Sequence, residues 1–199
     1  MDTPEAIKDL QGLEIYNKRR VWRPFMEKYG CQRICELGVY DGDNFELMIA
    51  HDPEVAVAVD SWIDDYKTSG TLNRNDVGHT QEYLDSQYAK FKEKFSDKPF
   101  VKLFRGYTFD AAKLFSNEYF DLIYIDADHS FEGCLRDIED WYPKMKPGGF
   151  LTGDDFRNAV ASRTRVKFGV VEAVKLFCKD NKLTYYELPR YGWAIIKPL

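Results

Sequence analysis

The sequence lacks the features that define several large classes of protein. No apolar stretch in its 199 residues approaches the roughly 20 residues of a membrane-spanning helix. The acidic start, residues 1–5, has no profile of a signal peptide. Basic residues are not in excess, since 28 Lys and Arg stand against 33 Asp and Glu and give a net charge of −5, whereas nucleic-acid-binding proteins usually present a basic face. We therefore expect a cytoplasmic protein with no membrane and no nucleic-acid partner.

Cysteine is also scarce. The four cysteines form no Cys-x-x-Cys pair and have no histidine nearby, which excludes the usual zinc and redox motifs. Cys35 and Cys134 are expected to be small core residues. The one short basic run, Lys18–Arg20, is expected to be a solvated face of a helix. No repeat or linker divides residues 1–199, so we expect a single domain.

What the sequence does contain is an alternation of strand and helix patterns. Residues 1–30 are expected to be a helical segment, and residues 61–97 form a polar insertion that is too long for an ordinary connection. The order predicts an α/β fold with a mostly parallel, doubly wound sheet and an antiparallel hairpin at the C-terminus. The expected strands cover 33–37, 55–59, 100–104, 120–125, 150–152, 183–188 and 193–196, with helices at 45–49, 108–115, 131–145 and 170–179.

Polar residues follow the first five expected strands. Gly38 and Gly42 follow the first strand, and ligands of such sheets bind outside the carboxyl ends of the strands. The spacing is not Gly-x-Gly-x-x-Gly, and no Gly-Lys-Ser/Thr occurs, which disfavours a dinucleotide or a phosphate loop. The turn either brings the backbone close to an anionic ligand or is simply tight. Asp60, about 20 residues further on, suits a ribose diol, or else caps a helix or faces solvent.

Four aspartates end the fourth and fifth expected strands. These are Asp126, Asp128, Asp154 and Asp155, and their carboxylates repel each other unless a cation or a proton intervenes. Oxygen ligands favour Mg²⁺ or Ca²⁺, although some of these carboxylates can instead cap helices. His129 lies beside them and is either a general base or a structural residue.

Together these motifs resemble class I S-adenosylmethionine-dependent methyltransferases. The resemblance runs from about Arg33 to the C-terminal hairpin, and its most specific stretches are Glu36–Gly42 and Phe120–Asp155, with the Pro147–Gly149 turn. Within the second stretch, Tyr124–Gly133 is similar to the small bacterial and viral methyltransferases of the group that includes the macrocin-type sugar O-methyltransferases. It also resembles the metal-dependent catechol and caffeoyl-coenzyme A O-methyltransferases. It implies a Rossmann-like sheet of seven strands in the order 3-2-1-4-5-7-6.

The resemblance also implies the roles of individual residues. His129, where that family has a lysine, is expected to deprotonate the acceptor with Asp126. The third metal position, Asp155, is usually asparagine in the family, and Asn44 replaces a serine. The implied metal ligands are Asp126, Asp154 and Asp155. The implied cofactor-binding residues are Glu36, Gly38, Tyr40, Gly42 and Asn44 for methionine, Asp60 for ribose, Thr108 and Phe109 for adenine, and also Ser61 and Asp126.

We therefore expect S-adenosylmethionine-dependent O-methylation of a small hydroxylated acceptor, a sugar or an aromatic, assisted by Mg²⁺. A metal-independent transferase and a cofactor-binding module without transfer activity remain alternatives, while a nicotinamide or nucleotide-sugar enzyme is disfavoured by the glycine spacing. Trp62–Tyr88 is either an acceptor-binding lid or a packing insertion. The basic loop Arg157–Lys167 either attracts an anionic acceptor electrostatically or is simply a solvated loop. Whether the protein is a homodimer stays open.

Overall fold

The fold is built on one mixed seven-stranded sheet. The computed structural model describes residues 3–16, 19–63, 80–160 and 167–199. In this part the sheet order is β5-β4-β3-β6-β7-β9-β8, which is the predicted order 3-2-1-4-5-7-6 in terms of the seven sheet strands. Five strands are parallel, and β9 is antiparallel to β7 and β8. The sheet strands are β3 (Arg33–Leu37), β4 (Val55–Asp60), β5 (Val101–Arg105), β6 (Phe120–Ile125), β7 (Met145–Gly153), β8 (Tyr185–Leu188) and β9 (Gly192–Ile196).

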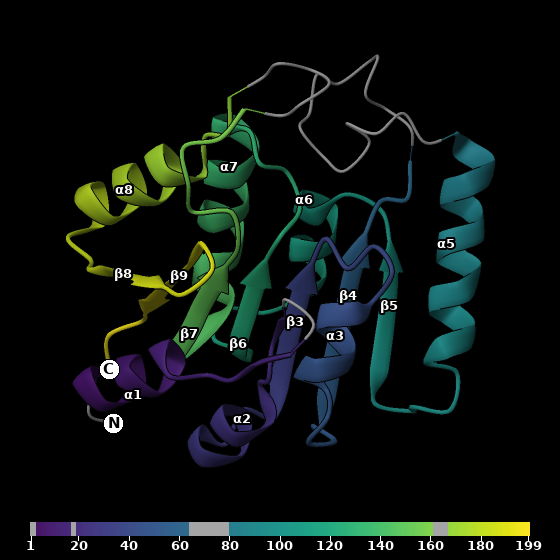
Figure 1. Cartoon of the computed structure of the whole chain (residues 1–199), viewed down its shortest axis with the longest axis horizontal. Helices are drawn as coiled ribbons and strands as arrows, with labels where there is room; N and C mark the ends of the chain where they lie inside the picture. The colour runs from purple at the N-terminus through teal and green to yellow at the C-terminus, as the bar shows by residue number, and fades with distance from the viewer. Residues whose placement is uncertain (1–2, 17–18, 64–79, 161–166) are drawn as a thin grey trace.

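Helices cover both faces of the sheet (Figure 1). Alternate residues of the strands point to opposite faces, so Ile34 joins one hydrophobic cluster and Cys35 joins the other. One face is covered by α1 (Thr3–Gln11), α2 (Arg23–Tyr29), α3 (Asp43–Met48) and α5 (Gln81–Lys94). The other is covered by α6 (Thr108–Ala111), the 3-10 turn η2 (Ala112–Leu114), α7 (Phe131–Trp141), which continues into the 3-10 turn η3 (Tyr142–Lys144), and α8 (Val170–Asn181).

The N-terminal segment differs from the prediction. Between α1 and α2 the chain forms a small antiparallel hairpin of β1 (Ile15–Tyr16) and β2 (Arg19–Arg20), so residues 1–30 are not helical throughout. The expectation that the basic run is a solvated helix face is wrong for Arg19 and Arg20, because both lie in β2 and Arg20 is buried. Two-residue strands have no periodicity to reveal them.

The insertion is in part a packed helix. Within the predicted range 61–97, α5 begins at a Thr80 N-cap and buries Leu84 and Phe91 in the core. Its described part therefore supports the packing interpretation. Residues 64–79, on which the lid interpretation depends, lie outside the described residues.

The predicted turn before the fifth strand is also different. Residues 146–149 belong to the start of β7, where the pairing with β6 shifts register between Phe120 and Leu122. Gly148 has a φ of +78°, a conformation that glycine adopts without strain. Proline and glycine residues occur both in turns and at irregular strand starts, so the sequence pattern predicted a turn where the structure has the start of β7.

The core contains all four thiols. Cys31, Cys35, Cys134 and Cys178 are free and buried, which confirms the expectation for Cys35 and Cys134. In the described ranges, no helix is both long and apolar enough to cross a bilayer.

Candidate cofactor pocket and acidic cluster

A pocket opens at the carboxyl ends of β3, β4, β5 and β6. It contains about 770 Å³ of space that no atom occupies, part of it open to solvent. Seven of the ten residues expected to bind the cofactor line it. These are Gly38, Tyr40, Asp60, Ser61, Thr108, Phe109 and Asp126.

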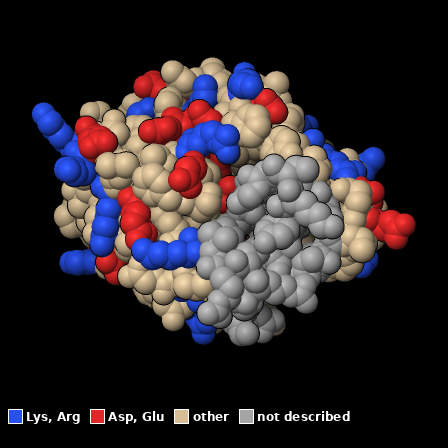
Figure 2. All heavy atoms as spheres, turned by 90° about the horizontal axis from the view of Figure 1, so that it is seen from above, with Lys and Arg blue, Asp and Glu red and all other residues tan. Residues whose placement is uncertain are grey.

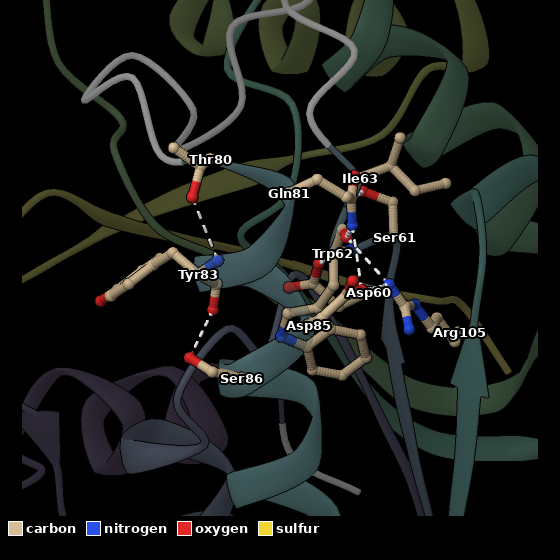
Figure 3. A network of polar contacts seen from close by, with 10 residues as sticks. All are labelled: Asp60, Ser61, Trp62, Ile63, Thr80, Gln81, Tyr83, Asp85, Ser86 and Arg105. Carbon is tan, nitrogen blue, oxygen red and sulfur yellow. Dashed lines mark hydrogen bonds and ion pairs between the residues drawn. The ribbon is translucent and has the colours of Figure 1, made fainter.

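The wall formed by β4 is organised by the Asp60 carboxylate. Its Oδ2 accepts a hydrogen bond from the backbone N–H of Tyr40 at 2.8 Å, and its Oδ1 accepts one from Trp62 at 3.0 Å. The Trp62 carbonyl in turn accepts hydrogen bonds from Gln81 and Arg105, which connects α5 and β5 to this wall (Figure 3). Asp60 therefore also fixes the backbone of two loops, where Tyr40 and Trp62 have φ values of +46° and +45°.

An aromatic layer forms the opposite end of the pocket. The rings of Tyr107 and Phe109 stack with centroids 5.1 Å apart, and the Arg136 guanidinium lies 4.8 Å from the Phe109 centroid. Below them the Thr108 hydroxyl donates to Oδ1 of Asp137. Burial, as the largest cause, raises the pKa of Asp137 to about 7. Aromatic and guanidinium groups of this kind can pack against a flat, partly apolar ligand group.

Three of the residues expected to bind the cofactor are not among the described residues that line this pocket. Glu36 is buried and accepts a hydrogen bond from Asn44 at 3.1 Å. Asn44 in turn accepts one from the indole N–H of Trp22. Gly42 begins α3 with a φ of +79°, and a Cβ there would lie 2.8 Å from the Phe91 ring. These three residues support the wall behind the glycine turn. The sequence pattern assigned them to the cofactor because helix packing uses the same small and polar residues that ligand contact does.

The acidic cluster lies beside the pocket, where β6 and β7 end. The structure brings together Asp126, His129 and Asp155, whose ligand atoms all lie within 4.8 Å of one another. His129 Nε2 is 3.1 Å from Asp126 Oδ1 and 3.2 Å from Asp155 Oδ2. The imidazole also stacks on Phe168 at 5.1 Å, which fixes the plane of the ring.

Asp154 lies outside this group of three but is electrostatically coupled to it. Burial, as the largest cause, and the charges of Asp126 and Asp155 together raise its pKa to about 6, while the charge of Arg20 acts in the opposite direction. The structure thus places His129 where the sequence-based ligand set has Asp154. Tyr124 is buried on the same side, and its hydroxyl accepts a hydrogen bond from Arg20 at 3.2 Å.

Two further predictions concern the surroundings of the cluster. Asp128 Oδ1 accepts a hydrogen bond from the backbone N–H of Ser130, which is itself the N-cap of α7. Asp128 therefore binds a backbone N–H group and does not cap the helix. In the loop 157–167, Arg157 pairs with Asp155 at 2.7 Å and Lys167 pairs with Glu172. Residues 161–166, which include Arg163 and Arg165, lie outside the described residues. On the described surface of this edge, acidic and basic side chains lie directly beside each other (Figure 2).

Sequence reasoning missed one wall of the pocket. Gly133, Arg136 and Asp137 line it from α7, and their i, i+3, i+4 spacing places them on one helix face. That spacing was the available signal, but it does not distinguish a face toward a ligand from a face toward solvent or the core. Trp62 and Gly106 also line the pocket and follow strand ends.

The family comparison, together with the fold, shows a class I, S-adenosylmethionine-dependent methyltransferase. Residues 35–156 match the family model of a methyltransferase domain. This match covers more than half of the chain, and the chain therefore belongs to that methyltransferase family. A comparison with curated protein sequences gives no match.

Solved structures with the same fold include several O-methyltransferases. The O-methyltransferase NovP is 14% identical, with a TM-score of 0.62 over 97% of this chain and 79% of its own. An O-methyltransferase from Bacillus cereus, solved in complex with SAH, is 16% identical, with a TM-score of 0.57 over 99% and 83%. A Staphylococcus aureus protein assigned as a caffeoyl-CoA O-methyltransferase is 16% identical, with a TM-score of 0.64 over 99% and 93%.

Proposed function

We propose that this methyltransferase transfers the methyl group of S-adenosylmethionine to a hydroxyl of a small acceptor, a sugar or an aromatic, with the help of a divalent cation. The observation that carries the proposal is the Asp126–His129–Asp155 cluster beside the pocket, in which Asp126 and His129 are buried. Carboxylates and an imidazole can bind a cation and accept a proton. A hydroxyl that acts as a nucleophile must lose its proton, and a cation can assist this loss by lowering the pKa of the hydroxyl.

The pocket is proposed to hold the cofactor in an extended orientation. Asp60 and Ser61 bind the ribose hydroxyls, and Thr108 and Phe109 border the adenine. Gly38 and Tyr40 lie against the methionine part, where Gly38 lets the backbone approach closely. Glu36, Gly42 and Asn44 support this end from behind. The sulfonium of the cofactor supplies the methyl group, and positioning the two reactants can contribute about 7–11 kcal/mol to lowering the barrier.

The residues present fit a divalent cation. Asp126 and Asp155 offer carboxylate oxygens at the same point, and the Asp154 carboxyl is coupled to both, so we propose these three as ligands. A cation held by these residues would lower the pKa of the acceptor hydroxyl and orient it. Mg²⁺ suits such an oxygen-rich set.

His129 is proposed to take the proton of the acceptor at Nε2. The carboxylates of Asp126 and Asp155 stabilise the resulting imidazolium, since both lie within about 3.2 Å of that nitrogen. The acceptor oxygen then bonds to the methyl carbon as the carbon–sulfur bond breaks, which yields the methyl ether and S-adenosylhomocysteine. The chain needs no covalent intermediate.

The same cluster also supports a second candidate, a metal-independent transferase. His129 already has two carboxylates to orient it, so proton transfer could proceed without a cation. To separate the two, transfer from radiolabelled S-adenosylmethionine is measured on a panel of sugars, phenols and catechols. We expect hydroxyl methylation that stops after exhaustive chelation and returns with Mg²⁺ or Mn²⁺. Activity that survives chelation supports the metal-independent candidate, and methylation of nitrogen or carbon acceptors alone contradicts O-transfer.

The cofactor assignment is tested by Asp60→Ala. We expect S-adenosylmethionine to bind at least about tenfold more weakly, because the variant loses the carboxylate and also the hydrogen bonds that fix the backbone of Tyr40 and Trp62. Isothermal titration calorimetry measures the affinity. Asp97→Ala, which removes an exposed aspartate, is the control and should bind normally. Unchanged affinity in Asp60→Ala contradicts the assignment.

The remaining expectations are proposals about partners. A small-molecule acceptor is proposed to enter from the cluster side, and neither nucleic acid nor membrane is proposed as a partner. A cytoplasmic location and a homodimer also remain proposals. Gel filtration with light scattering tests the dimer directly.

A further inference from the structure

The wall of the pocket that α7 forms contains a buried acid. Asp137 lines the pocket, yet only 2% of its surface is exposed, and its Oδ2 is buried without a hydrogen-bond partner. Acids at this depth are rare unless they are paired or hydrogen-bonded. Its Oδ1 accepts a hydrogen bond from the hydroxyl of Thr108. The role of this acid therefore has to be sought in its contact with Thr108.

Thr108 is held by α7 at two points. Asp137 accepts from its hydroxyl, and the indole N–H of Trp141 donates to its backbone carbonyl at 3.2 Å. Asp137 and Trp141 are four positions apart and so lie on the same face of α7. Thr108 is the first residue of α6 and lines the pocket itself. Because a β-branched side chain has few rotamers, both the backbone and the hydroxyl of Thr108 are fixed at the pocket wall.

The direction of this hydrogen bond limits what Thr108 can offer to a ligand. A hydroxyl has one proton and two lone pairs, whereas an ionised carboxylate can only accept. The proton of Thr108 is therefore engaged with Asp137, and only lone pairs remain for a ligand. In adenine the free ring nitrogens are acceptors, and the amino group at C6 is the donor. A base that forms a hydrogen bond with this hydroxyl oxygen must therefore do so through its amino group.

We propose that Asp137 is a positioning residue that fixes the Thr108 hydroxyl as a hydrogen-bond acceptor, so that the pocket selects the 6-amino group of the cofactor's base. The inference rests on the proposed function in so far as adenine lies beside Thr108 and Phe109. The stacked rings of Tyr107 and Phe109 do not supply this selectivity, because every base has a π-face that can stack. Hydrogen bonding at Thr108 is what distinguishes one purine from another.

The test compares S-adenosylhomocysteine with its 6-deamino analogue, which carries purine in place of adenine. Binding is measured by isothermal titration calorimetry at about pH 8.5, where Asp137, whose pKa burial raises to about 7, is ionised. We expect the wild type to prefer S-adenosylhomocysteine about tenfold, because a ring nitrogen of the analogue can offer Thr108 only a lone pair.

Asp137→Leu should reduce this preference to less than about threefold, because the released hydroxyl can turn and donate to a ring nitrogen. The ratio of the two affinities is the decisive quantity. A residue that only supports the fold would weaken both ligands alike and leave the ratio unchanged. If Asp137→Leu does not fold, the smaller Asp137→Val replaces it.

Three further variants complete the comparison. Thr108→Val keeps the β-branched shape without the hydroxyl and should also lose the preference, whereas Thr108→Ser keeps the hydroxyl and should retain it. Glu139→Leu makes the same change as Asp137→Leu at an exposed acid of the same helix. It should bind both ligands as the wild type does.

The outcomes separate this inference from the proposed function. The inference is overturned if the wild type shows no preference, or if the preference is unchanged in Asp137→Leu or in its replacement. It is also overturned if Thr108→Val keeps the preference, since Asp137 would then act on the base without Thr108. In each of these cases binding of S-adenosylhomocysteine leaves the proposed cofactor site intact. Failure of the wild type to bind S-adenosylhomocysteine would contradict that site and the inference together.

Discussion

Asp137, in the wall of the pocket, has a buried carboxyl group whose protonation depends on its surroundings in the fold. Asp137 is 2% exposed, its Oδ1 accepts from Thr108, and its Oδ2 is buried without a partner. A buried carboxyl of this kind favours the protonated form, since ionisation in an apolar environment is costly. Stability should therefore depend on this proton.

The sign of that dependence follows from the pKa of Asp137, about 7 in the fold against 3.8 in the unfolded chain. Between these values the folded state holds a proton that the unfolded state has lost, so Asp137 reduces stability as pH rises. We expect Asp137→Asn to gain stability over the wild type between about pH 4 and pH 7, by up to a few kcal/mol, and to keep a constant advantage above pH 7. Urea unfolding at several pH values measures this.

Glu139→Gln is the control for that experiment, because it removes an exposed acid from the same helix. Its stability difference from the wild type should stay flat over the same range. Parallel curves for Asp137→Asn and the wild type would contradict the expectation.

At the scale of residues, the sequence predicted which charged residues stand at strand ends, but it did not predict which side chains they contact. Asp60, Asp126 and Asp155 stand at strand ends as expected, because strand ends follow from hydrophobic runs. Arg20 and Asp137 were missed, since their roles depend on contacts with residues about 100 and 29 positions away, Tyr124 and Thr108. No local pattern carries such information.

At the scale of elements, the turn between β3 and α3 depends on the close passage of two chain segments. Gly38 has a φ of +86°, and a Cβ there would lie 2.1 Å from the Asp126 carbonyl oxygen. Its N–H donates to Val59 in β4. The turn is therefore clamped between β4 and the end of β6, which places the pocket wall beside the acidic cluster.

Gly38→Ala should be severely destabilising, by more than about 4 kcal/mol, because backbone atoms of Asp126 cannot move aside without displacing β6. Gly30→Ala is the matched control. Gly30 also has a positive φ, +62°, but a Cβ there meets nothing within 4 Å, so only the conformational cost of about 1–2 kcal/mol applies. Denaturant unfolding of both variants separates the cost of the steric clash from the conformational cost of a positive φ. Equal losses of stability in the two variants would contradict the close packing of Gly38 against Asp126.

Element prediction succeeded where periodicity was strong. All seven strands of the sheet are confirmed, because buried strands read as apolar runs separated by helical spacing. Their order, which is also confirmed, was implied by the family resemblance and not by this periodicity. The hairpin of β1 and β2 and the irregular start of β7 were not predicted. Short or irregular elements are stabilised by tertiary contacts, which leave no period in the sequence.

At the scale of the whole molecule, cofactor binding should stabilise the fold. A ligand that binds only the folded state at 100 times its Kd adds about 2.7 kcal/mol, which corresponds to a rise in Tm of roughly 5–10 °C for a chain of about 200 residues. S-adenosylmethionine and S-adenosylhomocysteine should both produce this rise in a thermal-shift assay, and NAD should not. A rise with NAD alone would contradict the class of cofactor.

The four buried thiols have a consequence for the intact molecule. Burial raises the pKa values of Cys31, Cys35, Cys134 and Cys178, and only the thiolate reacts with alkylating agents. A folded molecule should therefore resist alkylation and mild oxidants, while an opened one exposes four reactive sulfurs. The rate at which iodoacetamide adds mass to the protein therefore measures how often the core opens, and no probe has to be introduced.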